Sequence, residues 1–164
     1  MPEEKPQKPR IYWDSCVFLS YINGLSDRLP EIETLLLGAE KDTIELLTST
    51  LSIVEVAFAT AERDQRALDE EAEKKISKLW LPSSPVKLVE FHRLIAEGAR
   101  DLMRKTLTKG WSLKPLDAVH LSTAARMAVA EFHTYDEKLP KYSELVGCKI
   151  QRPFVEQPGL FPPA

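Results

Sequence analysis

Short apolar segments alternate with longer helix-like segments along the chain, and this alternation is what most constrains the fold. Strand-like runs are expected at 10–13, 43–49, 86–91, 131–135 and 148–151. Segments expected to be helical separate them, at 15–23, 29–40, 50–64, 66–78, 91–108, 115–128 and 139–146. Strand–helix alternation is typical of α/β domains. The sequence therefore predicts a three-layer sandwich with a central, mostly parallel sheet of four or five strands.

The length and composition fit one ordinary globular domain. The chain has 164 residues, of which 43% are hydrophobic and 29% charged, enough to bury a substantial core. We expect the domain over residues 10–152, between a disordered N-terminal arm at 1–9 and an irregular tail at 153–164. No apolar run is long enough to span a bilayer, and the start is unlike a signal peptide. Cys16 and Cys148 lie far apart without metal-type spacing, which favours a cytoplasmic protein with reduced thiols.

Four carboxylates occupy positions where a site could form. Asp14 and Asp136 directly follow strand-like runs, and functional groups in open α/β sheets gather outside the carboxyl ends of the strands. Glu55 interrupts an otherwise apolar turn, where an unpaired carboxylate is costly, and Asp117 lies near the start of a helix. Each also has an ordinary explanation. Asp14 and Asp117 could cap helices, Glu55 could face solvent, and Asp136 could be a turn residue.

Taken together, the four acids indicate a metal site. Carboxylates that converge on one edge of a sheet repel each other strongly unless a cation lies among them. Oxygen ligands suit Mg²⁺ or Mn²⁺ rather than zinc, and such ions activate water and neutralise phosphate charge. We therefore predict a catalytic Mg²⁺ or Mn²⁺ site made of Asp14, Glu55, Asp117 and Asp136.

The order of these motifs resembles that of the PIN-domain nucleases, including the VapC-type toxins. The resemblance covers about residues 10–151 and is carried by Asp14–Ser15 after a strand and by "TSTLSIVEV", "LDAVHLSTAA" and "FHTYD". It implies a metal-dependent ribonuclease whose acidic quartet is the one above, with Ser15 and Thr134 as supporting residues. Many family members have Asn where this chain has Cys16, a departure that affects the fine geometry and predicts sensitivity to oxidation. The resemblance also implies an antitoxin partner and a homodimer.

A local basic stretch is the candidate RNA-binding surface. The formal net charge of −3 argues against wholesale nucleic-acid binding, but acids gathered in one site would leave the remaining surface closer to neutral. The predicted RNA-binding residues are Arg100, Arg104, Lys105, Lys109, Trp111 and Lys114. The alternative interpretation of this stretch is a solvated helix face.

Two further interpretations stay open. A non-catalytic PIN-like module could bind RNA or protein without cutting it. A phosphatase with an aspartyl nucleophile would typically carry a second Asp two residues after the first, where this chain has Cys16. His120 lies three residues after Asp117, but its apolar neighbours favour packing at the edge of the core over metal binding.

Overall fold

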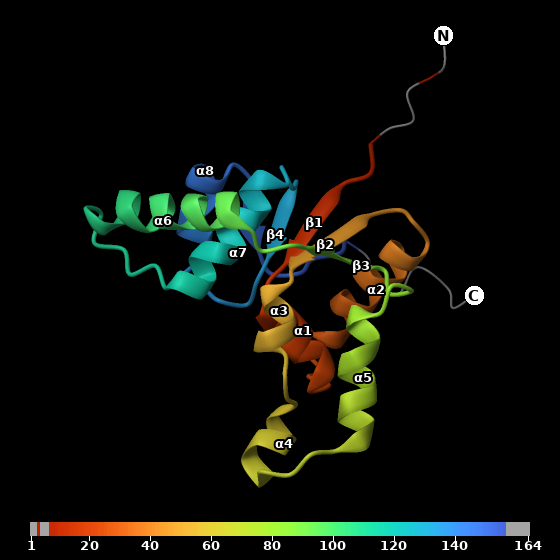
Figure 1. Ribbon diagram of the computed structural model, residues 1–164. Helices are drawn as coiled ribbons and strands as arrows, with labels where there is room; N and C mark the ends of the chain where they lie inside the picture. Colours follow the sequence, from red (N-terminus) through yellow and green to blue (C-terminus); the bar gives the residue numbers. More distant parts are fainter. Residues whose placement is uncertain (1–2, 4–6, 157–164) are drawn as a thin grey trace.

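A five-stranded parallel sheet forms the centre of the computed structural model, which describes residue 3 and residues 7–156 (Figure 1). The strand order is β3-β2-β1-β4-β5, and every neighbouring pair is parallel. The strands are β1 (Arg10–Trp13), β2 (Glu45–Ser49), β3 (Val86–Val89), β4 (Glu131–His133) and β5 (Lys149–Gln151). The predicted three-layer α/β sandwich with a parallel sheet is therefore confirmed.

Helices cover both faces of the sheet. On one face lie α1 (Ser15–Ile22), α2 (Leu29–Glu40), α3 (Leu51–Glu55), α4 (Thr60–Gln65) and α5 (Glu70–Trp80). On the other lie α6 (Arg93–Leu107), α7 (Pro115–Arg126), the 3-10 helix η1 (Pro140–Tyr142) and α8 (Ser143–Val146). Within the described residues, no helix is long and apolar enough to cross a membrane.

The central strand β1 supplies side chains to two separate cores. Ile11 and Trp13 pack with residues of α1, α2 and α5, whereas Tyr12 packs with residues of α6 and α7. All three are buried, because successive side chains of a strand point to opposite faces and both faces are covered here. This double burial fixes the register of β1, and with it the position of the residue that follows the strand.

The helix predicted over 50–64 is wrong in its middle. α3 ends at Glu55, residues 56–59 are irregular, and α4 begins at Thr60. The apolar face expected for a continuous helix therefore does not form: of Ile53, Val56, Ala57 and Thr60, only Val56 is buried.

A buried carboxylate explains the break between α3 and α4. Glu62 accepts the backbone N–H of Ala59 on Oε1 (3.0 Å) and that of Asp69 on Oε2 (2.9 Å). These bonds satisfy backbone N–H groups on both sides of the short α4. They stabilise a new helix start at Thr60 relative to a continuous helix.

The remaining differences concern the ends of elements. The polar helix expected at 66–78 corresponds to α5, which begins four residues later, at Glu70. It buries Ile76 and Leu79 against the sheet. Residues 7–9 and 153–156 form no helix or strand, and the rest of the predicted arm and tail lies outside the described residues.

A close approach between α6 and α7 yields a test of this packing. A Cβ added to Gly98 of α6 would lie 2.5 Å from Ser122 Oγ of α7, which donates to the backbone oxygen of Ile95 (2.8 Å). We expect Gly98→Ala to lower the free energy of unfolding by about 1–3 kcal/mol in urea titrations, despite alanine's better helix propensity. Combining it with Ser122→Ala should recover part of that loss. A neutral Gly98→Ala would contradict the close approach.

Candidate metal centre

The four acids reach one region from four elements. Asp14 directly follows β1, and Glu55 ends the short α3 that follows β2. Asp117 lies in the first turn of α7, and Asp136 lies three residues after β4. Because the sheet is parallel, the chain leaves β1, β2 and β4 at the same edge, as the sequence analysis expected.

Asp14 is the buried member of this acidic group. It is 5% exposed, and its carboxylate accepts a hydrogen bond from the thiol of Cys16 (Sγ–Oδ1 2.7 Å). Asp14 occupies the N-cap position of α1, yet among the described residues its carboxylate accepts no capping backbone N–H. Burial raises its pKa, and the charge of Asp117 raises it further. The ordinary capping role therefore does not explain why a carboxylate lies here.

Asp117 and Asp136 interact through their charges. Burial raises the pKa of Asp117, and the charge of Asp136 raises it further, followed by that of Glu55. Asp136 also has the turn role that its sequence position allows, because its Oδ1 accepts the backbone N–H of Lys138 (2.9 Å). Its own N–H donates to Thr134 Oγ1 (3.0 Å), so this hydroxyl holds the loop that carries Asp136.

Glu55 is hydrogen-bonded to His120. Nε2 of His120 contacts Glu55 Oε1, and Nδ1 lies 2.6 Å from the hydroxyl of Tyr12. The histidine is buried, as expected, but its contact with a candidate catalytic acid was not foreseen. The available signal was its spacing of three residues from Asp117 on one helix face.

The chemistry of these donors fits a hard divalent cation. All four side chains offer carboxylate oxygens, the ligands that Mg²⁺ and Mn²⁺ prefer. Burial raises the pKa of Asp14 and of Asp117, and a neighbouring carboxylate adds to each rise, a repulsion that a cation would relieve. Within residues 7–156, however, no three Asp, Glu, His or Cys side chains already form a ligand group.

Lysines surround the cleft that contains Asp117 and Asp136. The cleft has a volume of about 290 Å³, and its charged rim consists of Lys114, Lys138 and Lys141. Lys114 belongs to the predicted RNA-binding stretch, whereas Lys138 and Lys141 were not singled out. Their signal was proximity to Asp136 in "YDEKLPKY". The cleft therefore offers both acidic oxygens and ammonium groups.

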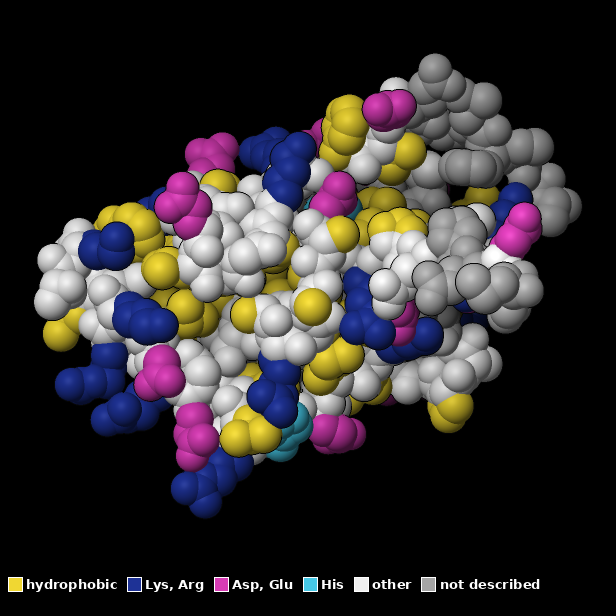
Figure 2. All heavy atoms as spheres, turned by 90° about the horizontal axis from the view of Figure 1, so that it is seen from above, with side chains coloured by type: hydrophobic (Ala, Val, Ile, Leu, Met, Phe, Trp, Pro, Cys, Tyr) yellow, Lys and Arg dark blue, Asp and Glu magenta, His cyan; other side chains and the backbone are white. Residues whose placement is uncertain are grey.

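Three of the other predicted RNA-binding residues lie away from the cleft lining. Arg100 and Arg104 border a groove together with Pro115 and Val119, and Lys105 is exposed on α6. Figure 2 shows one face of the molecule, on which basic and acidic side chains are interspersed rather than gathered into one basic field.

Trp111 is more a packing residue than an open stacking surface. Its ring packs edge-on against Tyr142, with centroids 5.1 Å apart. The ammonium groups of Lys109 and Lys141 lie 5.1 and 5.2 Å from the centroid of its ring. The indole thus positions two lysines beside the cleft.

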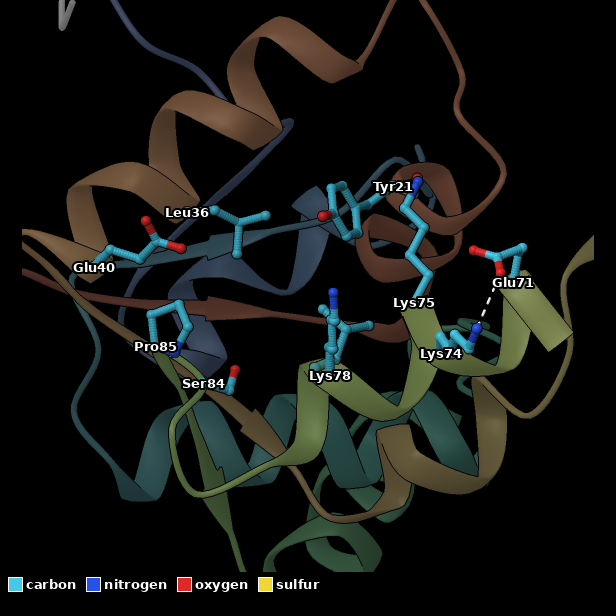
Figure 3. Close-up of a pocket in the computed structure, with 10 residues that line it drawn as sticks. Tyr21, Leu36, Glu40, Glu71, Lys74, Lys75, Lys78, Ser84 and Pro85 are labelled. Carbon is cyan, nitrogen blue, oxygen red and sulfur yellow. Dashed lines mark hydrogen bonds and ion pairs between the residues drawn. The ribbon is translucent and has the colours of Figure 1, made fainter. Parts of the chain in front are cut away.

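Figure 3 shows a second pocket, whose charged lining consists of three lysines together with Glu40 and Glu71. Its volume is about 470 Å³, and its lining includes Tyr21 of α1, Leu36 of α2 and three lysines of α5. Those lysines are Lys74, Lys75 and Lys78. None of the four acids lines this pocket, so its lysines serve below as a comparison for those of the cleft.

The raised pKa of Asp14 leads to a stability prediction. Because burial favours the protonated form, the stability that this group contributes is fully present below the pKa of an unfolded Asp and is lost as pH rises through the raised pKa. Asp14→Asn stays neutral. We expect Asp14→Asn to raise Tm in chelator at pH 7. The rise should be about 2–4 °C for each kcal/mol that burying the ionised carboxylate costs the wild type.

Two further comparisons check the cause of this Tm difference. The gain should shrink as pH falls towards the range in which an unfolded Asp titrates, about 3.9. Mn²⁺ should raise the Tm of the wild type more than that of the variant, because it binds the folded acidic group. A lower Tm for Asp14→Asn in chelator at pH 7 would contradict the burial argument.

Comparisons with known proteins agree with this fold. The sequence matches the PIN domain family over residues 11–145. No curated protein sequence matches the chain. Among solved structures, a chain of VapBC2 from Rickettsia felis, bound to a DNA fragment from its promoter, matches with a TM-score of 0.62 and 15% identity. It covers 87% of this chain and 98% of that one.

Two more solved structures share the fold at low identity. FitAcB from Neisseria gonorrhoeae matches with a TM-score of 0.59 and 15% identity, over 87% of this chain and 97% of that one. VapC20 from Mycobacterium tuberculosis, described as a sarcin-ricin loop cleaving toxin, matches with a TM-score of 0.58 and 13% identity. It covers 77% of this chain and 90% of that one. Because the family match spans most of the sequence, the chain belongs to the PIN domain family.

Proposed function

We propose that this chain is a metal-dependent endoribonuclease that hydrolyses RNA phosphodiester bonds. The observation that carries the proposal is the buried carboxylate of Asp14, whose pKa is raised by burial and by Asp117 at the carboxyl edge of the sheet. A buried carboxylate beside a half-buried like charge is costly and serves no packing purpose that a neutral residue could not serve. Membership of the PIN domain family supports the same activity.

The acids would hold one or two Mg²⁺ or Mn²⁺ ions. Asp14, Asp117 and Asp136 are the proposed ligands, and Glu55 completes the set or orients the attacking water. When bound, the metal supplies charge neutralisation at the phosphate and a more acidic water. The chain's own residues keep the acids in place: the thiol of Cys16 donates to Asp14, and Thr134 accepts from the N–H of Asp136. Hydrolysis would leave a 3′-hydroxyl and a 5′-phosphate.

The lysines of the cleft would hold the RNA backbone. Lys114, Lys138 and Lys141 share a lining with Asp117 and Asp136, so a phosphate bound there would lie beside the acids. Ammonium groups bind phosphates as flexible point charges, which suits recognition of a backbone rather than of one base.

We further propose that the nuclease is the toxin of a toxin–antitoxin pair. The support is likeness in fold to VapBC2 and to VapC20, the latter described as a toxin. A segment of the antitoxin would cover the acidic cleft, and the nuclease would act as a homodimer. Both cysteines are free thiols, which fits a reducing cytoplasm.

Cleavage of a mixed pool of structured RNAs tests the proposed activity. We expect cutting with Mn²⁺ or Mg²⁺ and none with chelator, because the acids alone cannot neutralise the phosphate. Asp14→Asn and Glu55→Gln should each lose at least about 100-fold in rate while staying folded. Asp64→Asn, which changes an exposed acid of α4, is the matched control and should cut normally.

The alternative interpretation makes an opposite prediction. A non-catalytic PIN-like module would bind RNA or protein without cutting any RNA of the pool. If the wild type cuts nothing and calorimetry finds no Mn²⁺ binding, the nuclease proposal fails and the binding module takes its place.

Replacing the cleft lysines tests the RNA path. Changing Lys114, Lys138 and Lys141 to Ala should raise KM for RNA and leave Mn²⁺ binding nearly unchanged, because these residues contact phosphate and not the metal. The salt dependence of binding should weaken by about 0.7 in log–log slope per phosphate contact removed. The control replaces the lysines of the other pocket, Lys74, Lys75 and Lys78. Equal effects of the two triple variants would contradict the assigned path.

A further inference from the structure

The backbone around Glu55 does not by itself fix the position of its carboxylate. Glu55 is the last residue of α3, a helix of five residues followed by the irregular segment 56–59. Its neighbours Ile53 and Val54 are exposed, whereas Val56 is buried, so packing holds the backbone here but not the side chain of Glu55. Helices this short are not stable alone. An acid that has to meet other acids therefore needs a contact from elsewhere.

That contact comes from a histidine on another element. His120 of α7 is 1% exposed, and its Nε2 is hydrogen-bonded to Glu55 Oε1. Its other nitrogen, Nδ1, lies 2.6 Å from the hydroxyl of Tyr12 in β1, the central strand. The ring thus links the end of α3 to the central strand of the sheet. Both ring nitrogens are used, and neither partner is on the histidine's own helix.

The proton arrangement along this chain of contacts follows from its first member. The backbone N–H of Ser49 donates to the hydroxyl oxygen of Tyr12 (3.1 Å). Burial raises the pKa of Tyr12, so the phenol keeps its own proton and donates it to Nδ1 of His120. At the other end of the chain, an ionised carboxylate can only accept hydrogen bonds, so the proton between Glu55 and the ring lies on Nε2. Nε2 therefore donates to Glu55 Oε1.

We propose that His120 is a positioning residue of the nuclease, which uses the Tyr12–His120–Glu55 chain to hold one oxygen of Glu55 and leave the other for the metal centre. The proposal rests on the proposed function and adds a residue to it. His120 touches neither substrate nor metal; it orients a carboxylate that does. Partners of this kind typically contribute 10- to 100-fold to metal affinity or activity.

The molecule contains a matched histidine with a different role. His133 of β4 is also fully buried and also bridges an aromatic residue and a glutamate. Its Nδ1 accepts from Trp13 Nε1 (3.2 Å), and its Nε2 lies 2.8 Å from Glu131 Oε2. Glu131 is the first residue of β4, at the strand end opposite the acids. Loss of this bridge should therefore cost stability without affecting the metal centre.

Calorimetric titration with Mn²⁺, without RNA, tests the proposal directly. His120→Leu should weaken Mn²⁺ binding by about 10- to 100-fold. His120→Gln keeps an N–H donor at a similar distance from the backbone and should recover most of this loss. His133→Leu should lower Tm yet bind Mn²⁺ like the wild type. With RNA, His120→Leu should lower kcat while leaving KM nearly unchanged, because the phosphate-binding lysines are intact.

The outcomes separate this proposal from the function on which it rests. If the wild type binds Mn²⁺ and folded His120→Leu binds it equally well, the positioning role is wrong and the nuclease proposal stands. If the wild type binds no Mn²⁺ and cuts no RNA, both proposals fail. If His120→Leu does not fold, Tyr12→Phe decides, because it removes only the hydroxyl that orients the ring. Unchanged Mn²⁺ affinity in Tyr12→Phe would then overturn the proposal.

Discussion

The parallel pairing of β1 with both β2 and β4 is the constraint on which the rest of the structure depends. Three strands that run in one direction release the chain at one edge, so Asp14, α3 and the loop after β4 meet there. The register is firm because β1 is buried on both faces, with Trp13 in one core and Tyr12 in the other. The acids converge as a consequence of strand order, even though 122 positions separate Asp14 from Asp136.

This convergence destabilises the folded protein unless each acid is held. Burial raises the pKa of Asp14, and burial together with the charge of Asp136 raises the pKa of Asp117. The ionised form of both side chains is therefore disfavoured. Three of the four acids have a specific hydrogen-bonding partner. The thiol of Cys16 donates to Asp14, and the imidazole of His120 contacts Glu55. A hydroxyl and a backbone N–H hold Asp136 and its loop. Such arrangements are typical of functional sites, where stability is given up for a fixed geometry.

The cleft combines charges of both signs within a small volume. Asp117 and Asp136 favour a cation, and the three lysines on the same lining favour an anion. A chain with a net charge of −3 can therefore present a local phosphate-binding surface without an overall basic surplus. Cys16 holds the acid that precedes it by two residues, because its thiol donates to Asp14 and its sulfur accepts the N–H of Tyr135 (3.2 Å).

The sequence by itself determined the layers, the parallel sheet and the positions of Asp14 and Asp136 after strands, because periodicity and strand ends are local properties. Tertiary structure decided what depends on contacts between distant segments. The break after Glu55 follows from the hydrogen bonds of Glu62 to two separate backbone donors. A pattern of apolar residues does not predict such bonds. Likewise, the link between Tyr12 and His120 joins residues 108 positions apart, so only the packing of α7 on the sheet brings that histidine to Glu55.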